Sequence, residues 1–347
     1  MEQFASILEE WYAAHKRELP WRETRDPYRI WISEIILQQT RVAQGEAYYQ
    51  RFIQRFPDVE SLATASEDEV MKYWQGLGYY SRARHLHAAA RSMAGKGFPA
   101  DYEGVRALQG VGDYTAAAIC SFAYDLPCAV VDGNVYRVLA RYFGIDAPID
   151  SSGGKKVFSA MAAEMLDRKH PALYNQAIME FGALQCTPSS PACLFCPLSA
   201  GCEALATGRV GELPVKQHRT KTTNRFLHYI YMTAGEEVYI RRREADDIWR
   251  NLYELPLVEA DHPLEEAELR RRLLSDWACP HEALASLRLV QRGVKHALSH
   301  RILYTDFYRM EWPRQQEPPA GYLRVTRQEL SDYAFPRLID AFFEKIG

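Results

Sequence analysis

The chain contains 347 residues, of which 47% are hydrophobic and 25% are charged, and its formal net charge is −3. A single hydrophobic core rarely grows beyond ~250 residues, so this length predicts two globular domains. The nearly neutral charge excludes a protein that holds nucleic acid by bulk positive charge. Any such binding would need a local basic face and backbone amides.

The N-terminus opens Met1-Glu2-Gln3-Phe4, without the basic and apolar segments of a secretory leader. The sequence has no apolar run of the ~20 residues that a membrane span needs. We therefore expect a soluble intracellular protein, in which the scattered cysteines Cys120, Cys128 and Cys279 are buried thiols.

Residues 1–208 have the pattern of an all-α domain. Asp26-Pro27 predicts the N-cap and first residue of a helix, in which Ile32, Ile35 and Ile36 follow at helical spacing. Short helices joined by short glycine-containing loops are typical of such domains. We predict further helices at 66–75, 80–95, 112–122, 133–142 and 157–167.

Glu34 lies in an unusually apolar part of the first of these helices, Ile30-Trp-Ile-Ser-Glu-Ile-Ile-Leu37. The commoner interpretation of such a carboxylate is a residue on the solvent-facing side of the helix. If Glu34 instead points into an apolar pocket, burial raises its pKa, and the side chain can act as a general acid near neutral pH.

The segment Gly76-Leu-Gly78-Tyr79-Tyr80-Ser-Arg-Ala-Arg84 combines glycines, aromatic residues and arginines. One interpretation is a turn between packed helices with core tyrosines. The other is a wedge that enters a base stack, flanked by arginines that bind phosphates.

A Gly-x-Gly turn, Leu108-Gln-Gly110-Val-Gly112, precedes the helix predicted at 112–122. Glycine permits positive φ and close approach, and the free amides at a helix start can hold a phosphate. A helix-hairpin-helix grips a DNA backbone in this way without reading its sequence, although the same turn also joins ordinary packed helices.

Asp132 ends an apolar run, Ala129-Val-Val, directly before the helix predicted at 133–142. One interpretation makes Asp132 only the N-cap of that helix. The other makes it a carboxylate that faces a groove and stabilises a developing cation.

Four cysteines are crowded into one proline-rich stretch, with gaps of six, two and five residues between them. Four thiolates so close in sequence can surround one zinc ion or one iron–sulfur cluster, and two disulfides are the remaining alternative. The four candidate ligands are Cys186, Cys193, Cys196 and Cys202.

Beyond a polar stretch at 209–224, which predicts a linker, the pattern changes to α+β. Two aromatic and β-branched runs, 226–232 and 238–241, flank Ala234-Gly-Glu236 as in a hairpin. A helix at 264–277 and a strand at 302–310 follow.

Taken together and in this order, these segments resemble the helix-hairpin-helix DNA glycosylases with an iron–sulfur cluster, and within them the MutY family of adenine DNA glycosylases. The resemblance implies removal of adenine mispaired with 8-oxoguanine or guanine in double-stranded DNA, during base excision repair. It also implies a [4Fe–4S] cluster rather than zinc. The segments that carry it are Leu19-Pro-Trp-Arg22, 31–40, 76–80, 108–112, 131–135 and the four cysteines.

Endonuclease III is the close alternative, because it shares this fold and cluster. Its family attacks the sugar with a lysine in the second hairpin helix. The matching residue here is Tyr114, which cannot form a Schiff base. The chain also continues well past the cysteines, and both points favour a monofunctional adenine glycosylase.

The resemblance further implies roles for the site residues. Glu34 protonates an adenine that has been flipped out of the duplex, and Asp132 stabilises the oxocarbenium-like sugar until water completes the hydrolysis. Tyr114 and Asn134 hold sugar and water in place. The expected substrate and DNA contacts are Arg22, Gln39, Tyr79, Gly110, Gly112, Gln176, Ser299 and His300.

The second domain resembles the Nudix-like lesion-recognition domain of MutY proteins. The stretch 249–256 resembles the strand before a Nudix box, but Arg270-Arg-Arg stands where acidic metal ligands are required, so we expect recognition without nucleotide hydrolysis. Leu298-Ser299-His300 matches the family's Phe-Ser-His loop that senses 8-oxoguanine, except that Leu298 replaces the aromatic residue. An ordinary polar pair at a strand start is the alternative for Ser299 and His300.

We therefore predict a multidomain protein with an all-α helix-hairpin-helix glycosylase domain at 1–208, which includes the iron–sulfur loop 186–202. The linker 209–224 and an α+β Nudix-like domain at 225–347 follow. We expect a monomer that acts on DNA in the cytoplasm, as in the bacterial cytosol and nucleoid, without a membrane. The alternative from another functional class is a DNA-binding protein whose helical domain is stabilised by a metal and which has no catalytic activity.

Overall fold

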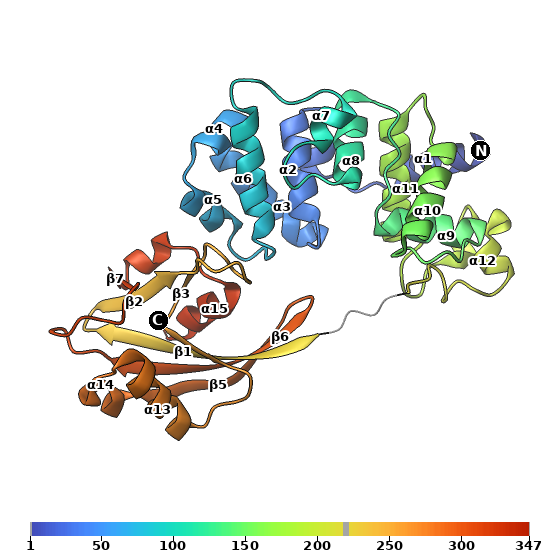
Figure 1. Cartoon of the computed structure of the whole chain (residues 1–347). Coiled ribbons are helices and arrows are strands. Elements are labelled where there is room, and N and C mark those ends of the chain that lie inside the picture. The colour runs from blue at the N-terminus through green and yellow to red at the C-terminus, as the bar shows by residue number, and fades with distance from the viewer. Residues whose placement is uncertain (1, 218–221, 347) are drawn as a thin grey trace. The chain divides into compact units, whose positions relative to one another are not determined.

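The computed structural model describes residues 2–217 and 222–346. Its contacts divide the chain into two compact units. The first unit comprises Met1–Thr64 and His85–Arg219, and the second comprises Ala65–Arg84 and Thr220–Gly347. The division falls inside helix α6 (Ser81–Met93), and each unit is described by itself (Figure 1). Within the described ranges, no helix has the length and apolar character of a membrane span.

The first unit is helical, as the sequence predicts. Asp26 caps α2 by accepting a hydrogen bond from the Tyr28 amide. Helix α10 begins at Ser152 rather than at 157, because Ser151 caps it and accepts from the Gly154 amide. Its elements are α1 (Glu2–His15), η1 (Pro20–Arg22), α2 (Pro27–Leu37), α3 (Val42–Arg55), α4 (Val59–Thr64), α7 (Tyr102–Arg106), α8 (Asp113–Tyr124), α9 (Gly133–Phe143), α10 (Ser152–Met165), α11 (Pro171–Leu184), η2 (Cys193–Phe195), η3 (Ser199–Gly201) and α12 (Glu203–Ala206).

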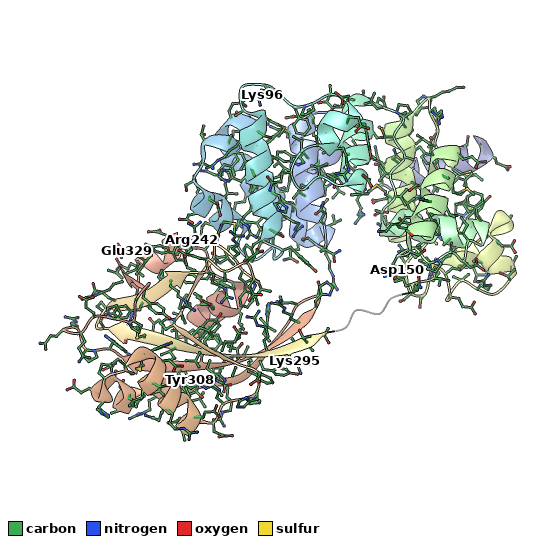
Figure 2. All side chains as sticks on the ribbon, viewed as in Figure 1. Lys96, Asp150, Arg242, Lys295, Tyr308 and Glu329 are labelled. Carbon is green, nitrogen blue, oxygen red and sulfur yellow. The ribbon has the colours of Figure 1, made fainter. Side chains whose placement is uncertain are left out.

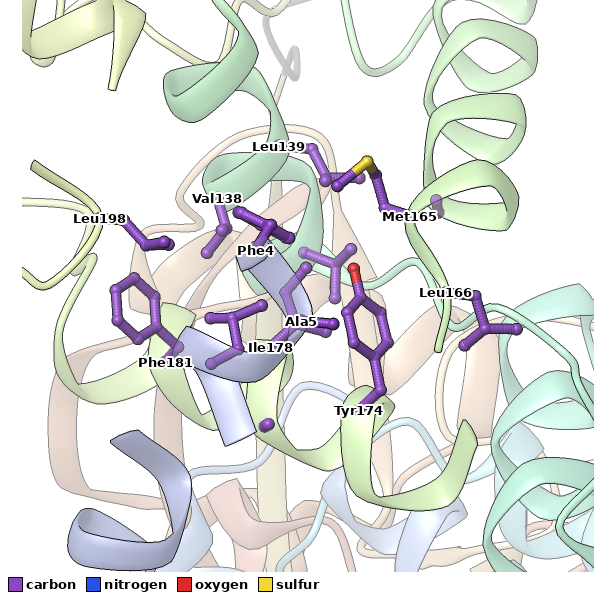
Figure 3. Packing of buried hydrophobic residues seen from close by; sticks show 14 of the residues in the cluster. Phe4, Ala5, Val138, Leu139, Met165, Leu166, Tyr174, Ile178, Phe181 and Leu198 are labelled. Carbon is purple, nitrogen blue, oxygen red and sulfur yellow. The ribbon is translucent and has the colours of Figure 1, made fainter. Parts of the chain in front are cut away.

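One hydrophobic core joins α1, α9, α10 and α11 in this unit (Figure 3). Phe4, Leu139, Phe158, Tyr174 and Phe181 are all buried there. Each such side chain contributes about 1.5–3 kcal/mol on burial, so the core fixes α9 against α11. The N-terminus of α9 and the face of α11 thereby acquire fixed positions, and both carry predicted site residues.

A tight turn joins α7 to α8 in the predicted helix-hairpin-helix. Gly110 has φ +81°, where a side chain would be strained, and a Cβ on it would lie 2.7 Å from the His85 Cβ. Gly112 is the N-cap of α8 with φ −94°, a conformation open to any residue, so the need for positive φ lies at Gly110. Helix α8 also packs on α2.

The second unit is built on a mixed sheet of order β3-β2-β1-β6-β5, with β4 beside β1 and β7 beside β2. The predicted hairpin is the antiparallel pair of β1 and β2, and β1 runs parallel to β6. Its elements are α5 (Glu67–Trp74), β1 (Thr223–Ala234), β2 (Glu237–Arg242), β3 (Tyr253–Glu254), β4 (Leu257–Ala260), α13 (Glu266–Trp277), α14 (His281–Ser286), β5 (Arg288–Ala297), β6 (Arg301–Glu311), β7 (Leu323–Thr326), η4 (Glu329–Asp332) and α15 (Arg337–Ile346).

Alternate side chains of the sheet enter two different cores. Tyr229 and Phe307 pack with α15 on one face. Ile230 and Tyr308 pack with α13 and α14 on the other, where Figure 2 labels Tyr308. Because alternate residues of β1 enter the two cores, its whole C-terminal half is buried.

Residues 65–84 are tied to the second unit by polar contacts. The Tyr253 hydroxyl donates to Asp68 at 3.4 Å, and the Lys72 ammonium donates to the Tyr333 carbonyl at 3.0 Å. Of the predicted linker 209–224, residues 218–221 lie outside the described part. Leu213 is buried in the core of the first unit, and β1 begins at Thr223.

We expect Gly182→Ala to destabilise the first unit. A Cβ at Gly182 in α11 would lie 2.7 Å from the Asn134 Cβ and 2.9 Å from the Asn134 carbonyl oxygen, so α9 and α11 would have to separate. Overpacking of this kind costs about 1–3 kcal/mol. Urea unfolding measures the loss. Gly153→Ala in α10 is the matched control, because a Cβ there meets nothing within 4 Å. Equal stabilities of the two variants would contradict the prediction.

Candidate active site

A pocket of about 390 Å³ opens in the first unit, between α2, α8, α11 and the start of α9. It brings together residues that are far apart in the sequence and that were singled out there as candidates. The predicted site residues that line it are Arg22, Glu34, Gln39, Tyr114, Asp132, Asn134 and Gln176.

Glu34 is buried in this pocket, with only 7% of its surface exposed. Helix α2 packs its apolar residues against α8, and the same packing encloses the carboxyl group. The Tyr114 hydroxyl donates to Glu34 Oε2 at 2.8 Å. Burial raises the pKa of Glu34 to about 7, against the lowering effect of the Tyr114 hydrogen bond. The structure therefore agrees with the second interpretation of Glu34, in which its carboxyl group points into a pocket and is buried.

Asp132 is both the N-cap of α9 and a lining residue of the pocket. Its Oδ1 accepts from the amides of Asn134 and Val135, both at 2.8 Å, and its Oδ2 accepts from Asn134 Nδ2 at 2.7 Å. Burial raises the pKa of Asp132, while these hydrogen bonds and the charge of Arg137 oppose the rise. Asp132 thus has three donors for its anion, whereas Glu34 has one.

Two amide side chains complete the polar lining. Asn134 also accepts from Arg137, at 2.8 Å, which fixes its orientation at the start of α9. The Gln176 carbonyl oxygen accepts from the Tyr12 hydroxyl at 2.8 Å, so the Gln176 amide nitrogen remains as a donor toward the pocket. Gln39, next to the end of α2, has φ +60°, an uncommon conformation for a non-glycine residue.

The sequence analysis missed two further charged residues of this pocket. Glu180 on α11 is 1% exposed, and it binds both Arg17 and Arg22. The signal was a single carboxylate among apolar residues in Ile178-Met-Glu-Phe181, the same pattern as around Glu34. Arg17 had no local signal, because its partner is 163 residues away in the sequence.

The four clustered cysteines were tested as a metal site. Among the described side chains, no three metal-binding groups converge at ligating distance. The donor chemistry nevertheless fits a cluster. Burial raises the pKa of Cys196 to about 11, and its interaction with the other three cysteines adds to the rise. A cationic metal centre would favour the sulfurs as thiolate ligands. Arg141 holds the start of the loop by donating to the Thr187 carbonyl at 2.7 Å.

A second pocket, of about 640 Å³, lies in the second unit and contains the other predicted contacts. The hydroxyls of Tyr79 and Ser299 form a hydrogen bond, and His300 lines the same pocket. Tyr79 has φ +47° and is 47% exposed, so it is not a core tyrosine. Leu298 packs against the hydrophobic core of this unit. The indole of Trp249 lies edge-on to His296 with centroids 6.0 Å apart.

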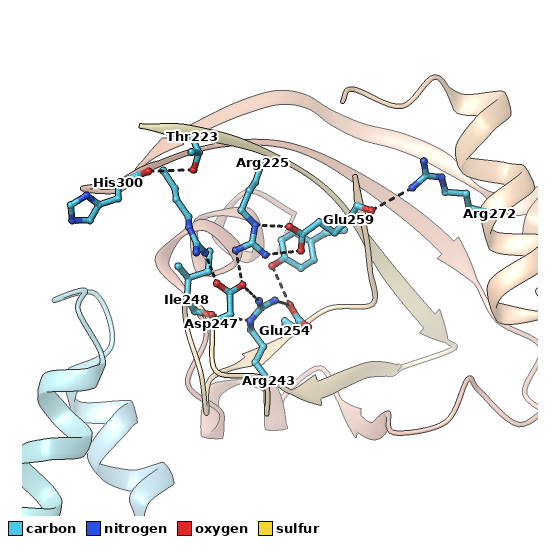
Figure 4. A network of polar contacts seen from close by, with 11 residues as sticks. Thr223, Arg225, Arg243, Asp247, Ile248, Glu254, Glu259, Arg272 and His300 are labelled. Atoms are coloured by element: carbon cyan, nitrogen blue, oxygen red, sulfur yellow. Dashed lines mark hydrogen bonds and ion pairs between the residues drawn. The ribbon is translucent and has the colours of Figure 1, made fainter. Parts of the chain in front are cut away.

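An ion-pair network supports this second pocket (Figure 4). Asp247 accepts from Arg225 at 2.6 Å and from Arg243 at 3.4 Å, and it also pairs with Arg301. Although burial opposes ionisation, the hydrogen bonds of Arg301 and Arg225 lower the pKa of Asp247 to about 2. Because Arg301 directly follows His300, the network fixes the loop 298–300 to the segment that carries Trp249.

Two family models match the chain. The HhH-GPD superfamily base excision DNA repair protein matches residues 32–157, and the NUDIX domain matches residues 228–345. The solved structure of a thermostable thymine-DNA glycosylase is similar over 59% of this chain and 96% of that chain, with a TM-score of 0.55 and 29% identity. Fold and pocket together thus define a base excision DNA repair glycosylase of the helix-hairpin-helix class.

Curated relatives narrow this class. The adenine DNA glycosylase of Buchnera aphidicola subsp. Baizongia pistaciae is 31% identical over 87% of this chain and 84% of its own length. The adenine DNA glycosylase of Rattus norvegicus is 42% identical over 61% of this chain, and the match covers 44% of the rat protein. The chain belongs to the MutY-type adenine DNA glycosylase family. It is therefore a DNA-repair enzyme, and the alternative of a DNA-binding module without catalytic activity is rejected.

We expect Glu34→Gln to stabilise the folded protein above pH 7. Folding raises the pKa of Glu34 from 4.5 to about 7. The folded state therefore holds this proton more tightly than the unfolded chain, and its advantage is lost as the pH rises from 4.5 through 7. The amide keeps an acceptor for Tyr114 but has no charge to bury, a gain on the order of 3 kcal/mol at pH 8.

Urea unfolding of both proteins at pH 5 and pH 8 measures this difference. We expect a small difference at pH 5, where the carboxyl is protonated in the folded state, and the full gain at pH 8. A difference that does not change with pH would contradict the raised pKa of Glu34.

Proposed function

We propose that this enzyme removes adenine paired with 8-oxoguanine or guanine from double-stranded DNA. It hydrolyses the N-glycosidic bond and leaves an abasic site. The observation that carries the proposal is the pairing of two differently held carboxyls, Glu34 and Asp132, in one pocket. The choice of adenine is supported by the family to which the chain belongs, since the fold also serves a thymine-DNA glycosylase.

The chemistry follows from the two carboxyls. A flipped adenine enters the pocket, and the protonated Glu34 donates its proton to the adenine ring. The bond between sugar and base breaks, and its electron pair leaves with the base. The carboxylate of Asp132 then lies beside the oxocarbenium-like sugar and stabilises its positive charge. Water adds to the sugar, and the proton that it releases returns to a carboxylate of the pocket.

Four polar residues assist this reaction. Tyr114 holds the Glu34 carboxyl, and Asn134 holds Asp132. Gln176 offers its amide nitrogen to the edge of adenine, and Arg22 contacts the base from the same pocket. Since Tyr114 occupies the position of the endonuclease III lysine and a phenol forms no Schiff base, the enzyme is a monofunctional glycosylase.

The second pocket is proposed to recognise the base opposite adenine. Ser299 and His300 supply hydrogen-bonding groups, and Tyr79 supplies an exposed aromatic ring. Leu298 gives an aliphatic side chain at the place where the family has an aromatic one, so stacking there is not part of the proposal. Gln39 and Tyr79 are proposed to wedge beside the lesion, while Gly110 and Gly112 let the α8 amides approach a DNA phosphate.

Cys186, Cys193, Cys196 and Cys202 are proposed to hold a [4Fe–4S] cluster. When bound, the cluster supplies a rigid cross-link for the loop and no step of the reaction. The gathering of four sulfur donors in one short loop supports this proposal, as does the family. A monomeric state and a cytoplasmic location, expected from the sequence, stay predictions.

We expect single-turnover release of adenine from a duplex that carries adenine opposite 8-oxoguanine. Strand breaks should form only after alkali, and borohydride should trap no enzyme on DNA. Glu34→Gln should slow release by about 100- to 10,000-fold, because it removes the general acid. Glu60→Gln is the matched control, since Glu60 is an exposed glutamate of α4. Full activity of the Glu34 variant, or spontaneous nicking of a thymine glycol duplex, would contradict the proposal.

We expect the purified protein to contain about four iron atoms per chain. Cys196→Ser should lose this iron and bind duplex DNA more weakly, because the loop 186–202 loses its cross-link. Cys279→Ser is the control, since Cys279 is a buried thiol of the second unit, outside the loop. Zinc instead of iron in metal analysis would refute the cluster.

A further inference from the structure

Glu180 is a buried carboxylate that the proposed chemistry does not use. It lies on α11, lines the same pocket as Glu34, and is 1% exposed. Arg17 donates to it from Nε at 2.8 Å, from a terminal nitrogen at 2.5 Å and from its backbone amide at 3.0 Å. Arg22 donates to both carboxylate oxygens, at 3.0 and 2.7 Å.

These bonds determine how Arg22 can lie. Its two terminal nitrogens are bound to Glu180, and one of them, Nη1, also donates to the Arg17 carbonyl at 3.2 Å. One face lies over the Tyr12 ring at 5.6 Å. Among residues 2–217 and 222–346, Nε of Arg22 has no hydrogen-bond partner, so this donor remains for a bound base. Planar bidentate pairs of this kind fix orientation as well as contributing energy.

The triad also sets the local charge. Arg17 and Arg22 contribute two positive charges and Glu180 one negative charge, so the triad carries one net positive charge. Glu34 faces this charge together with Tyr114 and Asp132, and the charge of Arg22 opposes the effect of burial on Glu34. The Tyr12 hydroxyl is a further titratable group beside the triad. Without the carboxylate, two uncompensated guanidinium charges would act on Glu34.

We propose that Glu180 is a positioning residue for base excision, which orients Arg22 toward the flipped base and screens Glu34 from the two arginine charges. This inference rests on the proposed glycosylase function. The competing explanation is a purely structural one, in which Glu180 only ties α11 to the segment 17–22. The two explanations differ in what happens to the proton on Glu34.

The first test is Glu180→Gln, with the single-turnover rate of adenine release measured from pH 5 to pH 9. The reaction requires a protonated Glu34, and extra positive charge favours the Glu34 anion. The alkaline limb of the pH–rate profile should therefore move to lower pH by about one unit. The rate should therefore fall about ninefold at pH 8 but only about twofold at pH 6. A uniform fall at every pH, with a lower melting temperature, would show a purely structural role and overturn the proposal.

Two further variants test charge and position separately. The double variant Arg17→Gln/Glu180→Gln leaves one net positive charge on the triad, as in the wild-type protein. Its alkaline limb should therefore return toward the wild-type pH. Glu180→Asp keeps the charge but shortens the side chain, and it should keep the wild-type limb with a lower rate. If Glu180→Gln does not fold, Arg17→Gln alone removes a positive charge and should move the limb to higher pH. A limb that is unmoved in that variant would overturn the proposal.

A readout without DNA separates this inference from the proposed function. Carbon-13 NMR of the Glu34 carboxyl reports its titration in the free protein. If wild-type protein releases no adenine but Glu180→Gln lowers the titration midpoint, the proposed function fails and the charge effect of Glu180 stands. If adenine is released but the midpoint is the same in both proteins, the inference about Glu180 fails alone.

Discussion

The active pocket depends on the high free energy of a buried carboxylate. A carboxyl group removed from water either keeps its proton or needs donors that replace the lost hydration. Glu34, Asp132 and Glu180 line one pocket and meet this requirement in different ways. Glu34 has one hydroxyl donor and keeps its proton to about pH 7, Asp132 has backbone and amide donors, and Glu180 has two guanidinium groups. A neutral acid and a stabilising anion can therefore coexist a short way apart.

The second unit solves the same problem chiefly with arginine. Asp247 takes three guanidinium partners, and Glu254 pairs with Arg241 at 2.9 Å and with Arg243. Guanidinium groups remain charged in both folded and unfolded chains, so such pairs are insensitive to pH near neutrality. The two pockets thus differ in character: the first contains a group that titrates near pH 7, whereas the network beside the second is permanently ionic.

Local pattern was enough to predict much of this structure. The all-α and α+β regions, the cap at Asp26 and the hairpin of β1 and β2 follow from periodicity and turn residues, because those features involve neighbours in sequence. The start of α10 was wrong, since Ser151 was not recognised as its cap. For Glu34 the sequence left two environments open, because the face of α2 that is buried depends on α8, which lies about 80 residues further along the chain.

The residues that were missed have partners far away in the sequence. The carboxylate of Glu180 binds Arg17 across 163 residues, and Asp247 binds Arg301 across 54. No periodicity encodes such pairs, because tertiary packing selects them. The resemblance to a family supplied the catalytic candidates. It did not supply the residues that orient those candidates.

Asp132 both caps α9 and lines the pocket, and this has a consequence for how variants at this position are detected. Asparagine is as good an N-cap as aspartate, so an Asp132→Asn protein would keep the capped α9 and the packed core while lacking the anion in the pocket. Such a protein would pass cellular quality control, which senses unfolded chains. A variant that lacks only this anion would therefore escape detection by its abundance or its melting temperature, and only an activity assay would reveal it.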